Sequence, residues 1–340
     1  MNKILVTGGA GYIGSHTVVE LVHAGFKPVI IDDFSNAEKD VIARIEQITG
    51  QSVPYYTGNC TDYHFMDDVF KKEEPLAGVI HFAASKAVGE STQKPLLYYE
   101  NNLLSLIQLL KIMHHYHVTD LVFSSSCTVY GQPHQLPVTE NSPVKPASSP
   151  YGFTKQFCEQ ILADTVGSGA ALKAIALRYF NPIGAHPSAK IGELPIGTPN
   201  NLVPFITQTA AGKRDKLTVF GNDYNTPDGT CIRDYIHVVD LAKAHVKALS
   251  YLGKNDELRL YEVFNIGVGQ GSTVLQVIDA FEQATGVKLN YEIGSRRPGD
   301  VEQVYADAKK AFDKLGWQAA LTINDAMKDA WRWEESLKNR

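Results

Sequence analysis

The sequence has few cysteines, and it has no long hydrophobic run. An apolar stretch of about 20 residues, which a membrane helix needs, is missing, and Ile4-Leu5-Val6 is too short for the core of a signal peptide. The cysteines form no CxxC pair and show no metal-ligand spacing, which argues against a disulfide framework. They are Cys60, Cys127, Cys158 and Cys231. These absences predict a cytoplasmic protein with no membrane partner.

Clusters of basic residues are also missing. The chain carries 32 Lys and Arg against 37 Asp and Glu, a net charge of -5, whereas a nucleic-acid surface needs a basic patch. We therefore expect no nucleic-acid partner. His114, His115 and His117 share one predicted helix without a cysteine or carboxylate to complete a metal site, so we expect no metal. With 340 residues, 44% of them hydrophobic, the chain has room for about two domains of roughly 150 residues.

Short β-rich runs alternate with longer helical patterns through the first half of the chain. Several of these runs are almost continuously apolar, which is typical of parallel strands covered on both faces. Alternating strands and helices build right-handed βαβ units. We therefore predict an α/β fold with a doubly wound parallel Rossmann sheet. The predicted strands are Lys3–Thr7, Pro28–Asp32, Val53–Tyr56, Gly78–Phe82, Leu121–Ser125 and Ala174–Phe180.

After Phe180 the chain becomes rich in Pro, Gly and Asn. A strand and helix over Tyr235–Leu252 and a strand at Tyr261–Ile266 suggest that the chain returns to the main sheet. We therefore assign residues 1–180 and 235–266 to a nucleotide-binding Rossmann domain. Residues 181–234 and 267–340 form a second, smaller mixed α/β domain for the substrate.

A glycine-rich segment follows the first strand and opens the first helix. Residues 7–14 read TGGAGYIG, and in this context glycines allow a tight turn whose N–H groups approach a pyrophosphate. Asp32, at the end of the second strand, is placed to accept from an adenosine ribose, and with Asp33 it would repel a 2′-phosphate. No Arg lies nearby, so the pattern favours NAD over NADP. The alternative is a glycine turn and a solvated Asp pair that bind nothing. The glycines are Gly8, Gly9, Gly11 and Gly14.

A tyrosine and a lysine four residues apart form the candidate catalytic pair. Ser149 and Pro150 are typical of a helix start, and they place Tyr151 and Lys155 on one helix face. Ser126 follows the fifth strand, at the edge where ligands bind in open α/β sheets. A phenol acts as a base at neutral pH only if its anion gains about 4 kcal/mol of stabilisation, which a nearby cation can supply. A surface Tyr and Lys would be the alternative.

Several longer segments resemble the extended short-chain dehydrogenase/reductase family. TGGAGYIGSH (7–16), SSSCTVYG (124–131) and the Tyr151/Lys155 pair carry this resemblance. More narrowly, the chain is similar to the UDP-glucose 4-epimerases of that family. The segments that carry this narrower similarity are HFAASKAVGESTQKP (81–95), RYFNPIGAHPS (178–188), PNNLVPFI (199–206), FGNDYNTPDGTCIRDYIHVVDLA (220–242) and RRPGD (296–300).

The resemblance implies a redox-neutral reaction on a UDP-sugar. Tyr151, helped by Ser126, takes the proton from the sugar 4-hydroxyl, and the C4 hydride passes to tightly bound NAD. The 4-keto sugar then presents its other face, and hydride and proton return. Lys155 holds the nicotinamide ribose and lowers the pKa of Tyr151. Ser126, Tyr151 and Lys155 are thus the implied catalytic residues.

The resemblance also implies two sets of binding residues. Asn59 and Cys60 depart from the family pattern, where Asp and a hydrophobic residue are frequent. Arg233 and Arg297 suit a diphosphate, because guanidinium binds phosphate oxygens bidentately, whereas Asp300 suits a hydroxyl. The implied NAD contacts are Gly8, Gly11, Tyr12, Ile13, Gly14, Asp32, Asp33, Asn36, Asn59, Cys60, Phe82, Ala83, Lys86, Asn101, Tyr151, Lys155 and Phe180. The implied UDP-sugar contacts are Lys86, Ser126, Tyr151, Asn181, Asn201, Leu202, Thr218, Phe220, Arg233, Arg297, Asp300 and Val304.

Val304 falls where some relatives have a bulky Tyr beside the sugar 2-position. The smaller side chain predicts room for an N-acetyl group, and hence activity on UDP-GalNAc and UDP-GlcNAc, unless neighbouring residues fill the space. The helices over 95–116 and 150–165 carry extra apolar residues such as Leu103 and Phe157. Part of this stripe is core, and the resemblance implies that the rest forms the helix-bundle contact of a homodimer. The sequence alone does not separate these two uses.

Two other functions stay open. A nucleotide-sugar 4,6-dehydratase needs an acid and a base to expel the 6-hydroxyl, and the segment after Ser126 contains neither Asp nor Glu. A non-catalytic NAD-binding sensor has no need for the Ser126, Tyr151 and Lys155 set. Loss of turnover with retention of NAD in Tyr151→Phe separates an enzyme from a sensor.

Overall fold

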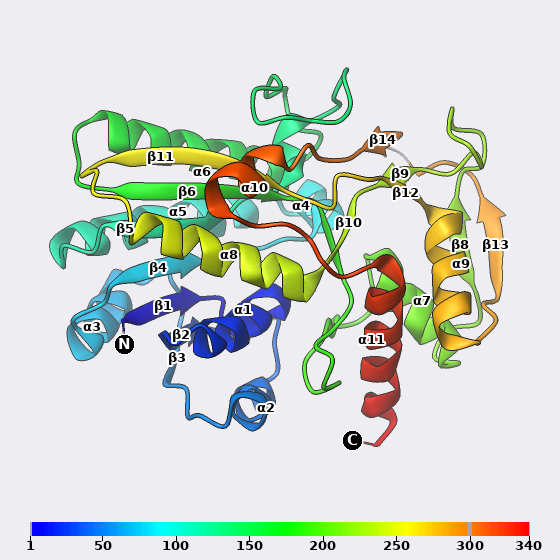
Figure 1. Cartoon of the computed structure of the whole chain (residues 1–340), viewed down its shortest axis with the longest axis horizontal. Helices are drawn as coiled ribbons and strands as arrows, with labels where there is room; N and C mark the ends of the chain where they lie inside the picture. The colour runs from blue at the N-terminus through cyan, green and yellow to red at the C-terminus, as the bar shows by residue number, and fades with distance from the viewer. Residues whose placement is uncertain (1, 298–300, 340) are drawn as a thin grey trace.

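A parallel sheet of seven strands forms the centre of the molecule in the computed structural model, which describes residues 2–297 and 301–339 (Figure 1). Its strand order is β11-β6-β5-β4-β1-β2-β3, which confirms the predicted doubly wound sheet. The predicted strands are also confirmed, with ends that shift by at most two residues. The strands are β1 (Lys3–Thr7), β2 (Lys27–Asp32), β3 (Tyr55–Thr57), β4 (Gly78–His81), β5 (Asp120–Ser124), β6 (Lys173–Tyr179) and β11 (Leu260–Ile266).

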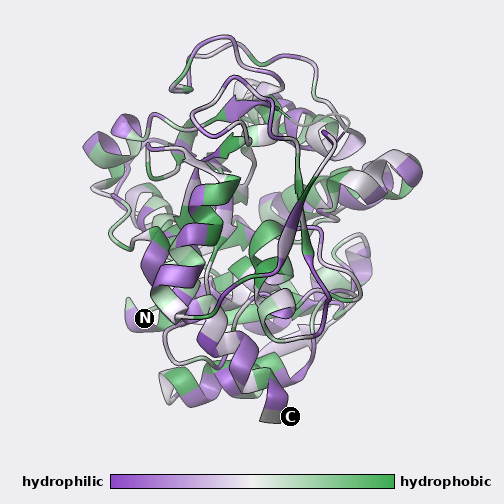
Figure 2. Ribbon diagram, turned by 90° about the vertical axis from the view of Figure 1, so that its right-hand side faces the viewer, coloured by the Kyte–Doolittle hydropathy of each residue, from purple (hydrophilic) through white to green (hydrophobic). Residues whose placement is uncertain are grey.

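Both faces of the sheet are covered by helices. Successive strand residues point to opposite faces, and because strands such as β1 carry apolar residues on both faces, each face needs a cover. Val6 packs in one hydrophobic cluster with α1 (Tyr12–His23), α2 (Asp40–Thr49), α8 (Val238–Leu252) and α10 (Lys309–Leu315). Leu5 packs in the other with α3 (Tyr63–Glu73), α5 (Pro95–His115) and α6 (Pro150–Gly167). The short helix α4 (Val88–Gln93) contacts α5 and α6. Figure 2 shows hydrophilic and hydrophobic residues within the same helices, as expected of helices that cover a core.

A second hydrophobic core lies beside the sheet, on the right of Figure 1. Ile206, Phe281 and Met327 are fully buried in it. It is built by α7 (Leu202–Ala210), α9 (Val274–Thr285), α11 (Ile323–Ser336) and the parallel pair β8 (Leu217–Phe220) and β13 (Tyr291–Gly294). This region confirms a smaller mixed α/β part of the fold. The domain boundaries stay a prediction, since α10 lies within 267–340 yet packs on α8 and β11.

Short strands connect the two cores. One small sheet pairs β7 (Asn181–Ile183) with β10 (Tyr235–His237), and another joins β9 (Ile232–Arg233), β12 (Ser272–Thr273) and β14 (Gln303–Val304). The 3-10 turns are η1 (Cys127–Tyr130) and η2 (Leu337–Asn339). In the part of the chain that the structure describes, no helix is both long and apolar enough to cross a bilayer.

Candidate active site

The strand order reverses between β1 and β4, and the glycine turn lies at this point. Gly8 has φ +69°, and a Cβ there would lie 2.8 Å from the Ala83 backbone nitrogen at the end of β4. A Cβ on Gly14 would overlap the Gly8 carbonyl oxygen. Helix α1 begins at Tyr12 with Gly11 as its cap, and no side chain satisfies its first N–H groups. The turn therefore has the shape and the free donors that a pyrophosphate needs.

Asp32 ends β2 beside this turn. Its Oδ2 accepts from the Ala10 N–H and its Oδ1 from the Phe34 N–H, both at 2.9 Å. Burial raises the pKa of Asp32, and these backbone hydrogen bonds oppose the rise. The carboxylate is thus fixed next to the glycine turn.

Four further residues that we predicted to contact NAD differ from Asp32 in their exposure. Asp33, Asn36 and Asn59 are exposed, whereas Cys60 is buried. Burial, together with the nearby acidic groups, raises the pKa of the Cys60 thiol to about 12. Asn59 accepts hydrogen bonds from the backbone and side chain of Thr61, so its amide is already oriented locally.

The catalytic candidates meet at the end of β5. Helix α6 starts at Pro150 with Ser149 as its cap, as predicted, and the Ser149 Oγ accepts from the Gly152 N–H. This start directs Tyr151 and Lys155 toward the strand end. The Lys155 ammonium donates to the Ser124 carbonyl at 2.7 Å, and the Ser126 side chain hydrogen-bonds Tyr151. The structure therefore brings the three catalytic candidates together.

Burial controls the protonation of this group. It lowers the pKa of Lys155 to about 8. It raises the pKa of Tyr151 well above its usual value, with a further rise from Tyr179 and an opposing hydrogen bond from Ser126. We expected the lysine to lower the pKa of the phenol. In the protein alone burial outweighs it, and the ammonium lies 5.9 Å from the centre of the Tyr151 ring.

A second group of candidates gathers around β9. The Asn181 N–H donates to the Asp234 carbonyl at 2.9 Å, and Val304 lies opposite Arg233 in the β14–β9 pair. Val304 is buried in one cluster with Phe180. Phe180, Asn181, Arg233 and Val304 are thus neighbours, although they come from three distant segments.

A third group spans the two cores. Glu193 lies 3.8 Å from the Lys86 ammonium and accepts at 2.6 Å from the Asn201 side chain. Leu202 follows as the first residue of α7. Next to Lys86, the Asn101 side chain donates to the Ser85 hydroxyl.

The remaining candidates lie on and beside the β8–β13 sheet. Thr218 and Phe220 belong to β8, and the Arg297 guanidinium lies 5.8 Å from the centre of the Phe220 ring. Phe220 is 45% exposed, so its ring is available to a flat ligand group. Asp300 lies outside the described residues.

Of the remaining NAD candidates, Tyr12 bridges the two cores, since its hydroxyl donates to the Gly184 carbonyl at 2.7 Å. Ile13 and Phe82 pack against the core on the α1 side of the sheet. The Phe82 ring lies 4.6 Å from the ring of His245.

Sequence reasoning missed three residues that organise these groups. The Ser124 carbonyl and the Glu193 carboxylate hold predicted lysines. The buried Asp234 carboxylate accepts from three backbone N–H groups, including that of Ala306. A backbone acceptor leaves no mark in a sequence, and a carboxylate that serves loops 30 or more residues away has no local pattern.

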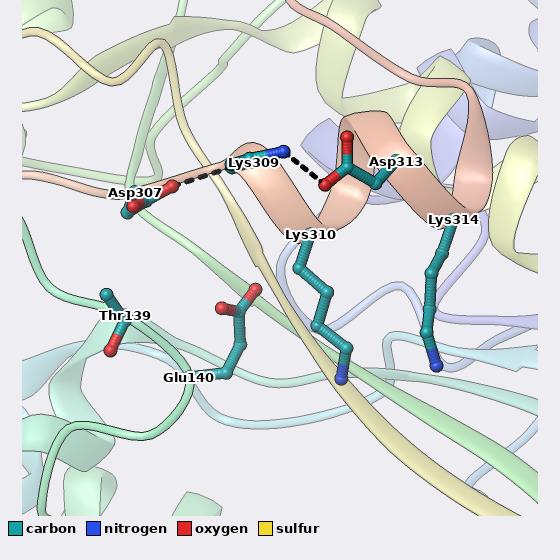
Figure 3. Close-up of a pocket in the computed structure, with 7 residues that line it drawn as sticks. All are labelled: Thr139, Glu140, Asp307, Lys309, Lys310, Asp313 and Lys314. Atoms are coloured by element: carbon teal, nitrogen blue, oxygen red, sulfur yellow. Dashed lines mark hydrogen bonds and ion pairs between the residues drawn. The ribbon is translucent and has the colours of Figure 1, made fainter.

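A hollow on the surface lies elsewhere, between α10 and the loop around Glu140 (Figure 3). None of the predicted site residues lines it. Lys309 is paired with Asp313, and Lys310 and Lys314 lie 3.2 and 2.8 Å from Glu262. Because these lysines are neutralised by carboxylates, we assign the hollow no ligand.

The glycine turn at the switch point and the Tyr-x-x-x-Lys helix facing a serine strand end define the class of extended short-chain dehydrogenases/reductases. The sequence matches the family model described as GDP-mannose 4,6 dehydratase over residues 5–330. It is 50% identical over 338 residues to UDP-glucose 4-epimerase of Dictyostelium discoideum, covering 99% of this chain and 97% of the relative. The chain therefore belongs to the UDP-glucose 4-epimerase family.

One further relative and one solved structure are also similar to this chain over almost its whole length. The bifunctional protein GAL10 of Pachysolen tannophilus is 52% identical over 98% of this chain, which spans only 49% of that relative. The crystal structure of UDP-glucose 4-epimerase from Stenotrophomonas maltophila, with bound NAD and formylated UDP-arabinopyranose, superimposes with a TM-score of 0.96 at 46% identity. That match covers 100% of this chain and 99% of the other.

Proposed function

We propose that this chain is an NAD-dependent UDP-hexose 4-epimerase that interconverts UDP-galactose and UDP-glucose. The observation that carries the proposal is the meeting of Ser126, Tyr151 and Lys155 at the strand end beside the glycine turn. Membership of the epimerase family supports the substrate class.

The glycine turn fits NAD, because side chains at Gly8 or Gly14 would fill it. In this proposal the N-terminus of α1 holds the pyrophosphate, Asp32 the adenosine ribose, and Lys155 the nicotinamide ribose. When bound, NAD supplies the hydride acceptor and donor together with a positive ring charge.

The chain's own residues handle the proton. Burial keeps the Tyr151 phenol neutral in the protein alone, so its Oη holds a proton until a cation enters the site. Ser126 orients this oxygen, and Lys155 is mostly charged below about pH 8. Once the phenol has released this proton to solvent, the Tyr151 phenolate is placed to accept the proton of a sugar hydroxyl and to return it.

In this proposal the UDP-sugar site is formed by the residues around β9, those around Glu193 and those on the β8–β13 sheet. Arg233 and Arg297 neutralise the diphosphate, and Phe220 stacks against the uracil. Lys86 approaches the diphosphate from the loop after β4 and forms an ion pair with Glu193 of the other segment. Asn181 and Val304 border the sugar ring, since both adjoin Phe180 or Arg233.

Purified protein without added cofactor, incubated with UDP-galactose, tests the proposal by NMR. We expect UDP-glucose to appear, and Tyr151→Phe to lower kcat by about 10²–10⁴ while keeping its NAD. Wild-type protein that releases no dinucleotide on denaturation and makes no UDP-glucose contradicts the proposal. An unchanged Tyr151→Phe points instead to a sensor.

The description of the matching family model names a second reaction, 4,6-dehydration, which is the alternative to epimerisation. A carboxylate near Ser126 is Glu159, which accepts from Ser125 Oγ at 2.5 Å and is buried in an ion pair with Arg178. It is therefore unavailable as the acid or base of elimination. The same NMR spectra separate the reactions, since dehydration produces a 6-deoxy methyl signal.

The small side chain of Val304 supports a wider substrate range. The side chain is 7% exposed and belongs to the buried cluster that also contains Phe180, so a larger residue at this position would have to project out of the cluster. We propose turnover of UDP-N-acetylgalactosamine as well, and a parallel incubation with this sugar tests it.

An apolar stripe on α5 and α6 supports a homodimer. Leu97 and Phe157 are each 47% exposed, and Phe157 stacks near Phe153 and Tyr99. Pairing these helices with those of a second copy would cover the stripe. We also propose a cytoplasmic location, which the unpaired state of the four cysteines supports.

A further inference from the structure

The end of β5 is connected to three successive turns of α6. Tyr151, Lys155 and Glu159 are spaced by four residues and share one helix face. Lys155 donates to the Ser124 carbonyl, and Ser126 hydrogen-bonds Tyr151. The third connection is new to the site: the Ser125 hydroxyl donates to Glu159 Oε1 at 2.5 Å.

Glu159 is itself fixed from another strand. Arg178 on β6 donates from Nε at 3.0 Å to Oε1 and from Nη2 at 2.5 Å to Oε2, a bidentate arrangement. The two side chains are 7% and 8% exposed. The same guanidinium lies 4.8 Å from the centre of the Tyr130 ring, in the turn that follows Ser126.

We propose that Glu159, held by Arg178, is a positioning residue that fixes the Ser124–Ser126 strand end against α6, so that Ser126 and Lys155 keep their places beside Tyr151. This inference rests on the proposed function. A buried ion pair contributes little net stability, whereas a shift of about 1 Å at a reacting group can cost about 100-fold in rate. Geometry at the strand end is therefore what the pair provides.

The charge of Glu159 has a second effect. It raises the pKa of Lys155, opposing the burial that lowers it to about 8. The other titratable groups facing Lys155 are Cys158 on its own helix, which also raises its pKa, Tyr151, and His81 on β4. Burial, together with Lys155, keeps His81 neutral near pH 7, since it lowers the pKa of His81 to about 3.

Two variants and one control test the proposal in the holoenzyme. Ser125→Ala removes one hydrogen bond without a charge change, and we expect kcat to fall about tenfold with KM within twofold. In Glu159→Gln we expect about a 100-fold fall in kcat. We also expect the alkaline limb of its pH–rate profile to lie at lower pH than in wild type. The control Asp120→Asn breaks the ion pair with Lys173 (3.1 Å) at the opposite end of β5 and should leave kcat and the pH profile unchanged.

A readout independent of turnover is the pKa of Lys155, measured by NMR on lysine-labelled protein with Lys155→Met for assignment. It should be lower in Glu159→Gln than in wild type and unchanged in the control. Wild-type kcat and an unmoved Lys155 pKa in the folded variants would overturn the proposal. If Glu159→Gln does not fold, Ser125→Ala decides alone. An inactive wild type would instead refute the proposed function, and the Lys155 titration would still judge the positioning role.

Discussion

Replacing the buried lysine of the catalytic group should make the protein more stable. Burial lowers the pKa of Lys155 from 10.5 to about 8, a difference that corresponds to about 3 kcal/mol. Folding therefore opposes the charged lysine at neutral pH. Lys155→Met removes this cost but leaves the Ser124 carbonyl without its donor, a loss of about 1–2 kcal/mol. We expect a net gain of about 1–2 kcal/mol in the free energy of unfolding at pH 7.

The sign of the pH dependence follows from proton binding. Below pH 8 the native and unfolded states both hold the lysine proton, so the cost is constant. Between pH 8 and 10.5 the unfolded state binds more protons than the native state, and wild-type stability rises with pH relative to the variant. The advantage of Lys155→Met should therefore vanish near pH 9.5.

Urea unfolding of wild type and variant from which bound NAD has been stripped, at pH 7 and pH 9.5, measures both effects, because bound NAD would add its own stabilisation. The matched control is Lys173→Met, which removes a lysine paired with Asp120 and bonded to the Leu252 carbonyl and should destabilise the protein at both pH values. A Lys155→Met variant that is less stable than wild type at pH 7 would refute the reasoning. So would a gain that is the same at both pH values.

Three further outcomes are expected. Gly14→Ala places a methyl group against the Gly8 carbonyl, so the purified variant should contain little NAD, as judged by absorbance after denaturation. Val304→Tyr should lower kcat/KM for UDP-N-acetylgalactosamine at least tenfold and spare UDP-galactose; equal losses on both sugars would exclude a size filter. Phe157→Glu should convert a dimer to a monomer in sedimentation, and an unchanged mass would place the interface elsewhere.

Local patterns predicted the sheet and the catalytic helix because their causes are local. The cap at Ser149 and the proline at the first helical position determine where α6 begins, and this start places Tyr151 and Lys155. The same spacing extends one more turn to Glu159, a signal that was present in the sequence. Its partner Arg178 lies on β6, whereas the Ser125 that Glu159 binds follows β5. Only the strand order shows that β5 and β6 are neighbours.

The protonation of the site was beyond sequence reasoning for a physical reason. The pKa of Tyr151 depends on how completely water is excluded, and burial is a property of the whole fold. The Glu193 contacts with Lys86 and Asn201 likewise depend on how the second core lies against the first. Residue types alone therefore identified neither the partners of Glu193 nor the partner of Glu159.

The late arrival of β11 has a consequence for synthesis. β6 ends at Tyr179, and the strand that pairs with it begins at Leu260. A ribosome must therefore translate the whole intervening segment while one side of β6 has no hydrogen-bonding neighbour. Such an open strand edge can capture another nascent chain, so production at low temperature or with a holdase chaperone should raise the yield of folded enzyme.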